Sequence, residues 1–213
     1  MKPPYAVLMM SQRTVLALVR HGETSANARE VWQGSLDKPL SERGARQAER
    51  LAQFMCEQYG NAVALYSSHL QRAQETARAI GAVLELPLRI DEDLREYDLG
   101  AWEGKSYDEL FNEHDLWQHI RTDPHFAPHG GESPRQVVDR FTRALRRIAR
   151  AHPGACVIVV AHGGALSMAL AEIVEGDYTK WGRVMDNCAV SELALDPEPE
   201  LIQFNQNAHL EGI

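Results

Sequence analysis

Short apolar runs alternate along the chain with stretches whose apolar residues recur every three or four positions. Thr14 to Val19 and Cys156 to Ala161 are nearly continuous apolar runs, the pattern of strands buried on both faces. Between them, Ser41 to Tyr59 and Leu70 to Leu84 have the period of helices with one apolar side. Strands that alternate with helices predict βαβ units, and therefore an α/β fold around a mostly parallel sheet.

Two further helices are predicted by their start signals. Ser106 and Glu109 have the spacing of a capping box, and Ser133, Pro134 and Gln136 combine a cap, a first-turn proline and a reciprocal partner. The remaining expected elements are the strands Ala62 to Tyr66, Leu88 to Ile90, Ala189 to Leu195 and Leu201 to Phe204, and the helix Ala165 to Val174.

Length and composition fit one globular domain. The 213 residues are 44% hydrophobic and 24% charged, and no repeat or linker divides them. We therefore expect a single domain over residues 14–213, after a loose N-terminal extension, residues 1–13. The net charge of −8 argues against a nucleic-acid surface, which needs a basic face. No apolar run approaches the roughly 18 residues of a membrane span, and residues 1–13 lack a signal-peptide pattern.

The three cysteines, Cys56, Cys156 and Cys188, match neither a zinc-ligand spacing nor a disulfide framework. Apolar neighbours, such as Met55 and the run that follows Cys156, favour buried and reduced thiols. Reduced thiols are typical of the cytosol, so we expect a cytoplasmic protein.

The ends of the two apolar runs carry the first candidate chemistry. His21-Gly22 follows the first run and His162-Gly163 follows the second, and Arg20 stands directly before His21. Ligands of parallel sheets bind at the carboxyl ends of the strands, so both histidines are expected at one site. An unprotonated imidazole can attack phosphorus at neutral pH, and a guanidinium can hold two phosphate oxygens at once. One such strand end alone is more often structural, whereas two on one sheet indicate a phosphate site.

Two more segments add candidate residues. Arg72 falls in the first turn of a predicted helix, where a positive charge is mildly unfavourable unless it faces an anion. The loop from Leu94 to Gly104 carries Glu96, Asp98 and Glu103, and any of these can act as the general acid that a leaving alkoxide needs. Position alone does not choose among the three carboxylates.

Taken in order, these segments resemble the histidine phosphatase superfamily, and within it the phosphoglycerate-mutase-like branch of the broad-specificity and alpha-ribazole phosphatase type. The resemblance runs from about Val15 to His209. The motifs that carry it are Arg20-His21-Gly22-Glu23-Thr24, Asn27, Trp32-Gln33-Gly34, Ser67-Ser68 with Arg72-Ala73, Leu94-Arg95-Glu96, Trp102-Glu103-Gly104, Gly131-Glu132-Ser133 and His162-Gly163. Each motif alone is weak, but their shared order and spacing are specific.

The resemblance implies a three-layer α/β/α sandwich whose mostly parallel central sheet has an antiparallel edge strand. It also implies roles for the candidate residues. His21 is then the nucleophile that carries the phosphoryl group, and Glu96 is the proton donor. The residues expected around the transferred phosphoryl group are Arg20, Arg72 and His162. Further contacts to the phosphate or substrate are expected from Asn27, Gln33, Gly34 and Gly163.

The implied reaction is hydrolysis of a small phosphorylated metabolite through a phosphohistidine. No metal or cofactor is expected, since arginines and histidine supply the positive charge. The expected partner is the small phosphorylated substrate, with no nucleic acid and no membrane, and a homodimer is left open.

Two other functions compete with hydrolysis. A cofactor-dependent phosphoglycerate mutase is the alternative among enzymes, although such mutases are longer and only 26 residues, 105–130, separate Gly104 from Gly131. A catalytically inactive binding protein on the same fold is the alternative from another class. A mutase assay and a phosphatase assay on the purified protein separate the three functions.

Overall fold

A six-stranded sheet is the middle layer of the computed structural model, which describes residues 13–128, 130–180 and 182–213. The strands are β1 (Val15–Arg20), β2 (Ala64–Ser67), β3 (Leu88–Ile90), β4 (Cys156–Ala161), β5 (Val190–Ala194) and β6 (Glu200–Gln206). Their order is β3-β2-β4-β1-β5-β6; the first four are mutually parallel, and β5 is antiparallel to both β1 and β6. The expected mostly parallel sheet with antiparallel pairing at one edge is confirmed. The expected N-terminal extension lies outside the described residues, Arg13 excepted.

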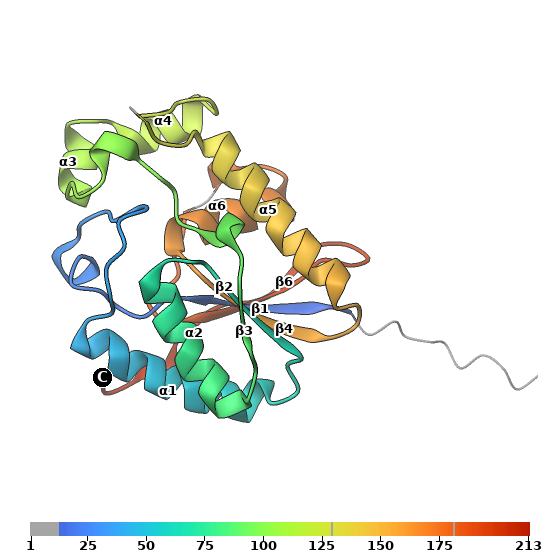
Figure 1. Ribbon diagram of the computed structural model, residues 1–213. Coiled ribbons are helices and arrows are strands. Elements are labelled where there is room, and N and C mark those ends of the chain that lie inside the picture. Colours follow the sequence, from blue (N-terminus) through green and yellow to red (C-terminus); the bar gives the residue numbers. More distant parts are fainter. Residues whose placement is uncertain (1–12, 129, 181) are drawn as a thin grey trace, which may run out of the picture.

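Helices cover both faces of this sheet and complete the expected three-layer α/β/α sandwich (Figure 1). α1 (Glu42–Tyr59) and α2 (Gln71–Leu84) pack on one face, and α5 (Pro134–Ala151) and α6 (Gly163–Glu175) pack on the other. The short helices α3 (Tyr107–Asn112) and α4 (Leu116–Thr122) lie together at the end of the sheet where β1 leads into its following loop. The 3-10 turns are η1 (Asn27–Arg29), η2 (Glu92–Leu94), η3 (Gly100–Trp102), η4 (Tyr178–Lys180) and η5 (Ala208–Leu210).

The central strands are apolar on both faces because helices cover both faces. In β1, Leu16 and Leu18 belong to the core under α5 and α6, whereas Ala17 and Val19 belong to the core under α1 and α2. All four side chains are fully buried. A strand in this position has no polar face, which explains the continuous apolar run in the sequence.

The helix start signals are confirmed, and one helix was not expected. Ser106 and Ser133 are both part of capping boxes, in which the cap side chain and the third helical residue exchange hydrogen bonds. α6 begins two residues before the expected Ala165, because His162 occupies the N-cap position. α4 follows Asp115, which has a φ of 46° and makes no side-chain cap, so its start leaves no signal in the sequence.

The expectation of buried cysteines is wrong for Cys56. That residue is exposed, Cys156 is half-buried and Cys188 is buried, and all three thiols are free. Cys56 follows the buried Met55 on α1. Successive helical side chains point about 100° apart, so an apolar neighbour in sequence does not place a residue on the buried face.

Parallel pairing of β1 with β4 fixes where the two histidines lie. The register pairs the last residues of these strands, Arg20 with Ala161, so His21 and His162 follow at the same level. β2 pairs with the other side of β4 and leads into the start of α2, where Arg72 lies. Three segments that are far apart in sequence therefore meet at one edge of the sheet.

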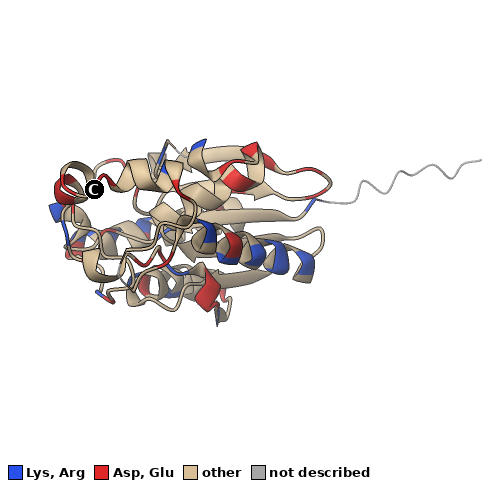
Figure 2. Cartoon of the chain, turned by 90° about the horizontal axis from the view of Figure 1, so that it is seen from above, with Lys and Arg blue, Asp and Glu red and all other residues tan. Residues whose placement is uncertain are grey.

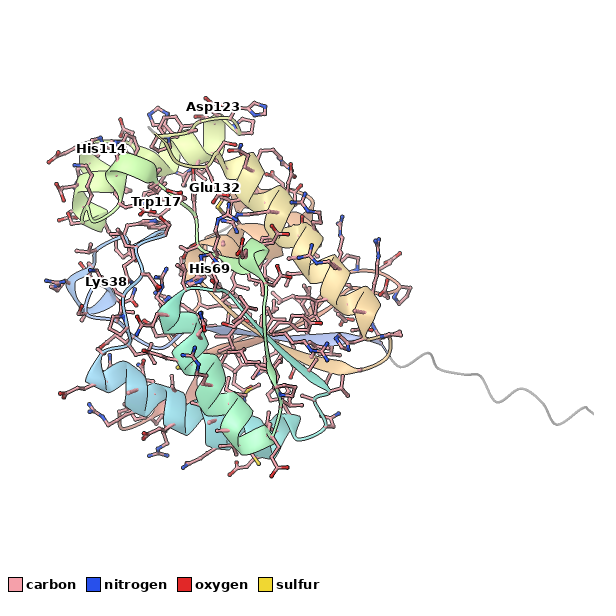
Figure 3. All side chains as sticks on the ribbon, viewed as in Figure 1. Lys38, His69, His114, Trp117, Asp123 and Glu132 are labelled. Carbon is pink, nitrogen blue, oxygen red and sulfur yellow. The ribbon has the colours of Figure 1, made fainter. Side chains whose placement is uncertain are left out.

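A buried ion pair holds the loop after β3 against α5. Arg140 on α5 is 4% exposed and donates to both carboxylate oxygens of Glu132, at 2.7 and 2.8 Å (Figure 3 labels Glu132 near the start of this helix). The same guanidinium donates to the backbone carbonyl oxygens of Asp93, Arg95 and Glu96. All five of its N–H groups are thus used, and one side chain fixes the path of the loop that carries Glu96.

Replacing Arg140 should therefore cost much of the stability. Arg140→Met leaves three carbonyl groups without their donor and removes the buried one of the two arginines that pair with the Glu132 carboxylate, the other being Arg95. We expect the free energy of unfolding in urea to fall by about 3–5 kcal/mol. Arg143→Met on the same helix is the matched control, because Arg143 is exposed. Figure 2 shows the arginines of α5 as blue bands along this helix. The effect of Arg143→Met should stay within about 0.5 kcal/mol. Equal losses in both variants would mean that the buried pair is not what stabilises this region.

Candidate active site

A cavity of about 480 Å³ lies at the carboxyl edge of β1 and β4. This volume falls in the range of about 300–1,000 Å³ that small-molecule sites have. The sequence-predicted residues that line it are Arg20, His21, Asn27, Gln33, Gly34, Arg72, Glu96 and Gly163. His162 is buried beside His21, with the two ring centroids 5.1 Å apart. The structure thus gathers every sequence-predicted site residue in one place.

His21 is held in one tautomer. Its Nδ1 lies 2.7 Å from the carbonyl oxygen of Gly22. A carbonyl can only accept a hydrogen bond, so Nδ1 carries the proton and Nε2 keeps its lone pair. Burial, followed by the charges of Arg72 and Arg20, holds the pKa of His21 well below its usual value, so the ring is neutral at pH 7. The Nε of Arg72 donates to Nε2 at 3.3 Å, which places a cation next to the nucleophilic atom.

His162 and Arg20 contribute hydrogen-bond donors that the protein leaves unused. Burial above all lowers the pKa of His162 well below its usual value, so its neutral ring has one N–H. No described residue bonds to either ring nitrogen of His162, or to the Nε of Arg20. A buried donor without a partner costs about 1–3 kcal/mol. An anion bound beside His21 would satisfy these donors.

Arg72 ties α2 to the loop that follows β1. Its guanidinium donates to the carbonyl oxygens of Gly34 at 2.7 Å and Leu36 at 2.8 Å. Burial lowers the pKa of Arg72 to about 10, so the side chain stays charged at pH 7. Gly34 has a φ of 52°, and a Cβ there would come within 2.0 Å of the Oε1 of Glu103. Glycine is required where this loop turns into the site.

The carboxylate of Glu96 is held by the start of α6. One of its oxygens accepts from the backbone N–H groups of Tyr97 at 2.9 Å and Ala165 at 2.7 Å, and the other accepts from Gly164 at 3.0 Å. A helix N-terminus favours an anion, and the anion that the start of α6 holds is this side chain. Glu96 is 9% exposed and lines the cavity, so it is fixed in place beside the phosphate-binding residues.

The other two carboxylates of this loop have different partners. Glu103 accepts from the backbone N–H and the hydroxyl of Ser35. Asp98 accepts from the backbone N–H of Gly100 within its own turn. Neither lines the cavity. The structure thus separates three carboxylates that the sequence alone left equivalent.

Thr24 organises the two amide side chains of the site. The Oδ1 of Asn27 accepts from the backbone N–H of Thr24 at 3.1 Å and from its hydroxyl at 3.0 Å. The Nε2 of Gln33 donates to the same hydroxyl at 2.8 Å. Because its oxygen is engaged, Asn27 can offer its amide nitrogen to a substrate oxygen.

Part of the cavity lining was not expected as site residues. These residues are Glu30, Trp32, Tyr107, Trp117, Val184, Asp186 and Asn187. Asn187 donates to the backbone carbonyl of His21 at 2.9 Å and so braces the loop of the nucleophile. Only Trp32 belongs to a motif recognised in the sequence. Glu30 directly follows η1, and the others come from α3, α4 and the segment before β5. No spacing in the sequence links any of them to the histidines.

Within residues 13–128, 130–180 and 182–213, no group of three or more His, Cys, Asp or Glu side chains is placed to hold a metal ion. The positive charges that line the cavity come from Arg20 and Arg72. No helix in this part of the chain has both the length and the apolar character needed to cross a membrane.

The two neutral histidines should make stability depend on pH. The pKa values of His21 and His162 in the folded protein lie below 6.5, whereas the unfolded chain takes up protons near 6.5. The contribution of these histidines to the free energy of unfolding is therefore complete above pH 6.5. It is lost as the pH falls toward their pKa values in the folded protein. The loss can reach about 1.4 kcal/mol per pH unit for each histidine.

Urea unfolding at pH 7, 6 and 5 measures this effect. His162→Gln should remove about half of the loss that His21 and His162 together cause. His125→Gln, in an exposed loop, is the control and should leave the pH dependence unchanged. A pH dependence in His162→Gln equal to that of the unaltered protein would contradict a neutral, buried His162.

Comparison with known proteins places this site in a family. Residues 16–207 match the histidine phosphatase superfamily (branch 1). A metal-independent phosphoserine phosphatase of Arabidopsis thaliana is 33% identical, over 97% of this chain and 87% of its own. The uncharacterized phosphatase PhoE of Bacillus subtilis is 31% identical, over 93% of this chain and 98% of its own.

A solved structure supports the same assignment. Phosphoserine phosphatase from Entamoeba histolytica, in complex with 3-phosphoglyceric acid, aligns with a TM-score of 0.82 at 26% identity, covering 92% of this chain and 99% of that one. The agreement in sequence, fold and coverage extends over nearly the whole described structure. The chain therefore belongs to branch 1 of the histidine phosphatase superfamily, as a phosphoric monoester hydrolase of the phosphoglycerate-mutase-like type.

Proposed function

We propose that this chain hydrolyses a small phosphorylated metabolite through a phosphohistidine formed on His21. The observation that carries the proposal is the tautomer of this residue. Its Nδ1 proton is committed to the Gly22 carbonyl, and its Nε2 lone pair lies 3.3 Å from the Nε of Arg72. A phosphoryl group on Nε2 is then within reach of a guanidinium. A histidine with a purely structural role does not need a cation at this atom.

In the first step, Nε2 of His21 attacks phosphorus and the bond from phosphorus to the alcohol oxygen breaks. Glu96, which is protonated when the substrate binds, gives its proton to the leaving oxygen and becomes a carboxylate. The Gly22 carbonyl stabilises the positive charge that develops on the imidazole. Charge on the transferred oxygens is stabilised by donors already in position. These donors come from Arg20, Arg72 and His162, with Asn27 as a further contact.

In the second step, water attacks the phosphorus of the phosphohistidine and Glu96 accepts a proton from that water. The nitrogen–phosphorus bond breaks, its electron pair returns to Nε2 of His21, and inorganic phosphate leaves. The N–H groups at the start of α6 hold Glu96 in the same position in both steps. One carboxylate can therefore serve first as acid and then as base.

The cavity favours hydrolysis over mutase chemistry. A phosphoglycerate mutase must bind substrates that carry a carboxylate and a second phosphate, and these groups need cations. Among the described residues that line the cavity, the lysines and arginines are Arg20 and Arg72 alone, and both serve His21. We further propose a cytoplasmic location, because the three cysteines are free thiols.

Turnover should depend on His21 as a covalent carrier. We expect His21→Ala to lower kcat at least about 1,000-fold, because the nucleophile is lost. Labelled substrate quenched in alkali during turnover should leave a base-stable, acid-labile phosphoryl group on the unaltered protein and none on the variant. Each assay is run with and without chelator, and His125→Ala serves as the control. Near-normal turnover by His21→Ala, or a chelator-sensitive rate restored by added metal, would overturn the mechanism.

Glu96 should be the proton donor, and leaving groups of different basicity test this role. An alkyl phosphate needs protonation of its leaving oxygen, whereas p-nitrophenyl phosphate hardly does. Glu96→Gln should slow the alkyl ester roughly 100- to 10,000-fold and the aryl ester far less. Glu103→Gln and Asp98→Asn are matched controls from the same loop and should affect both esters alike, if at all. The assignment is wrong if either control, rather than Glu96→Gln, shows the dependence on leaving group.

A further inference from the structure

Two kinds of side chain line the cavity beside the catalytic residues. Trp32, Tyr107 and Trp117 form what we call the aromatic wall. Glu30 and Asp186 add two carboxylates. Neither set has a role in the steps described for His21, so both are available to contact the part of the substrate that is not phosphate.

The aromatic wall is a packed unit built from separate segments. The ring centroid of Trp32 lies 6.0 Å from that of Tyr107 and 6.1 Å from that of Trp117. In Figure 3, Trp117 lies between the α3–α4 segment and the loop that follows β1. Tyr107 and Trp117 are half-buried, and burial raises the pKa of Tyr107, so its phenol is uncharged at pH 7. Rigid aromatic side chains of this kind offer flat apolar area to a planar group.

The charges beside the wall exclude a second anionic group. The carboxylate of Asp186 accepts from the side-chain amides of Asn205 at 2.9 Å and Asn207 at 2.7 Å, which fixes it in place. The side chain of Glu30 is exposed and unscreened by any described ion pair. The arginines of the described lining stand at His21, where the phosphoryl group binds. A carboxylate on the substrate would thus meet like charges, while the two arginines of the described lining would already hold the phosphoryl group.

From this lining we infer that the substrate is the monophosphate of an uncharged alcohol that carries a planar aromatic or heteroaromatic group, of which a nucleoside 5′-monophosphate is the simplest representative. The inference rests on the proposed phosphatase function and narrows it. It also separates this chain from the Entamoeba histolytica enzyme, whose structure contains 3-phosphoglyceric acid, a ligand with a carboxylate. The residues around the phosphoryl group serve the reaction itself, and the remaining lining of the cavity selects the alcohol part of the substrate.

Three substrates with primary alcohol leaving groups test the inference. Adenosine 5′-monophosphate has a planar base, ribose 5-phosphate lacks it, and O-phosphoserine carries a carboxylate. Because the leaving groups are similar, differences in kcat/KM report contacts to the rest of the molecule. We expect kcat/KM for adenosine 5′-monophosphate to exceed that for ribose 5-phosphate roughly 5- to 150-fold, the effect of stacking one base on an aromatic side chain. O-phosphoserine should be the poorest of the three.

The outcomes distinguish this inference from the function it rests on. Equal kcat/KM for the nucleotide and ribose 5-phosphate, or a preference for O-phosphoserine, overturns the inference and leaves phosphatase activity intact. Failure to hydrolyse any of the three, together with p-nitrophenyl phosphate, overturns the phosphatase function and this inference with it.

Variants locate the preference on the wall. Trp117→Ala should lower the ratio of kcat/KM for adenosine 5′-monophosphate over ribose 5-phosphate roughly tenfold. Phe111→Ala is the matched control, because Phe111 is a 56% exposed aromatic residue on α3 that does not line the cavity. An unchanged ratio in Trp117→Ala overturns the assignment to the wall.

A charge-reversal variant tests whether the acidic lining excludes carboxylates. Glu30→Lys should raise kcat/KM for O-phosphoserine relative to ribose 5-phosphate about fivefold at low salt, and the gain should shrink at high salt. Glu30 has a φ of 55°, and lysine takes that conformation no less readily than glutamate does. No gain at low salt overturns the claim that the acidic lining excludes carboxylates.

Discussion

The register between β1 and β4 is the constraint on which the site depends. These neighbouring parallel strands end together, and the chain turns into a histidine at each end. A slip of one residue would turn every side chain to the opposite face. It would move the residues packed under α5 and α6 into the layer under α1 and α2. The core residues on both faces of β1 therefore fix the relative position of His21 and His162 as firmly as they fix the fold.

Exclusion of water from His21 and His162 is the second consequence of that position. The histidines directly follow β1 and β4, and His162 is the N-cap of α6, so both side chains are buried away from water. Burial keeps both rings neutral, and it also strengthens the field of the two arginines beside them. Arg72 can carry its charge in this buried position because backbone carbonyl oxygens accept hydrogen bonds from its guanidinium. The same exclusion of water that would penalise an isolated charge makes a cationic cradle effective toward phosphate.

The sequence revealed those parts of the molecule in which local pattern and final position coincide. Continuous apolar runs predicted the central strands because both sheet faces are covered, and a histidine directly after such a run has little freedom in where it lies. Capping signals predicted two helix starts correctly. Glu96 could be separated from Asp98 and Glu103 only by resemblance, because the distinction lies in partners such as the N–H groups of α6, about 70 residues later in the chain. Trp117 could not be found at all, since α4 lacks a cap and reaches the cavity only through tertiary packing.

Chemistry and recognition occupy different parts of this chain. The phosphoryl-transfer residues stand at strand ends and helix starts within the three packed layers, or are tied to a helix start as Glu96 is, and a substitution there disturbs the core. Trp117, Tyr107 and Asp186 stand on short helices and loops outside those layers. Evolution can therefore exchange one set without disturbing the other. A family built in this way is expected to keep a single reaction while its members diverge in the alcohols they release, and the segment that holds α3 and α4 is where such divergence would accumulate first.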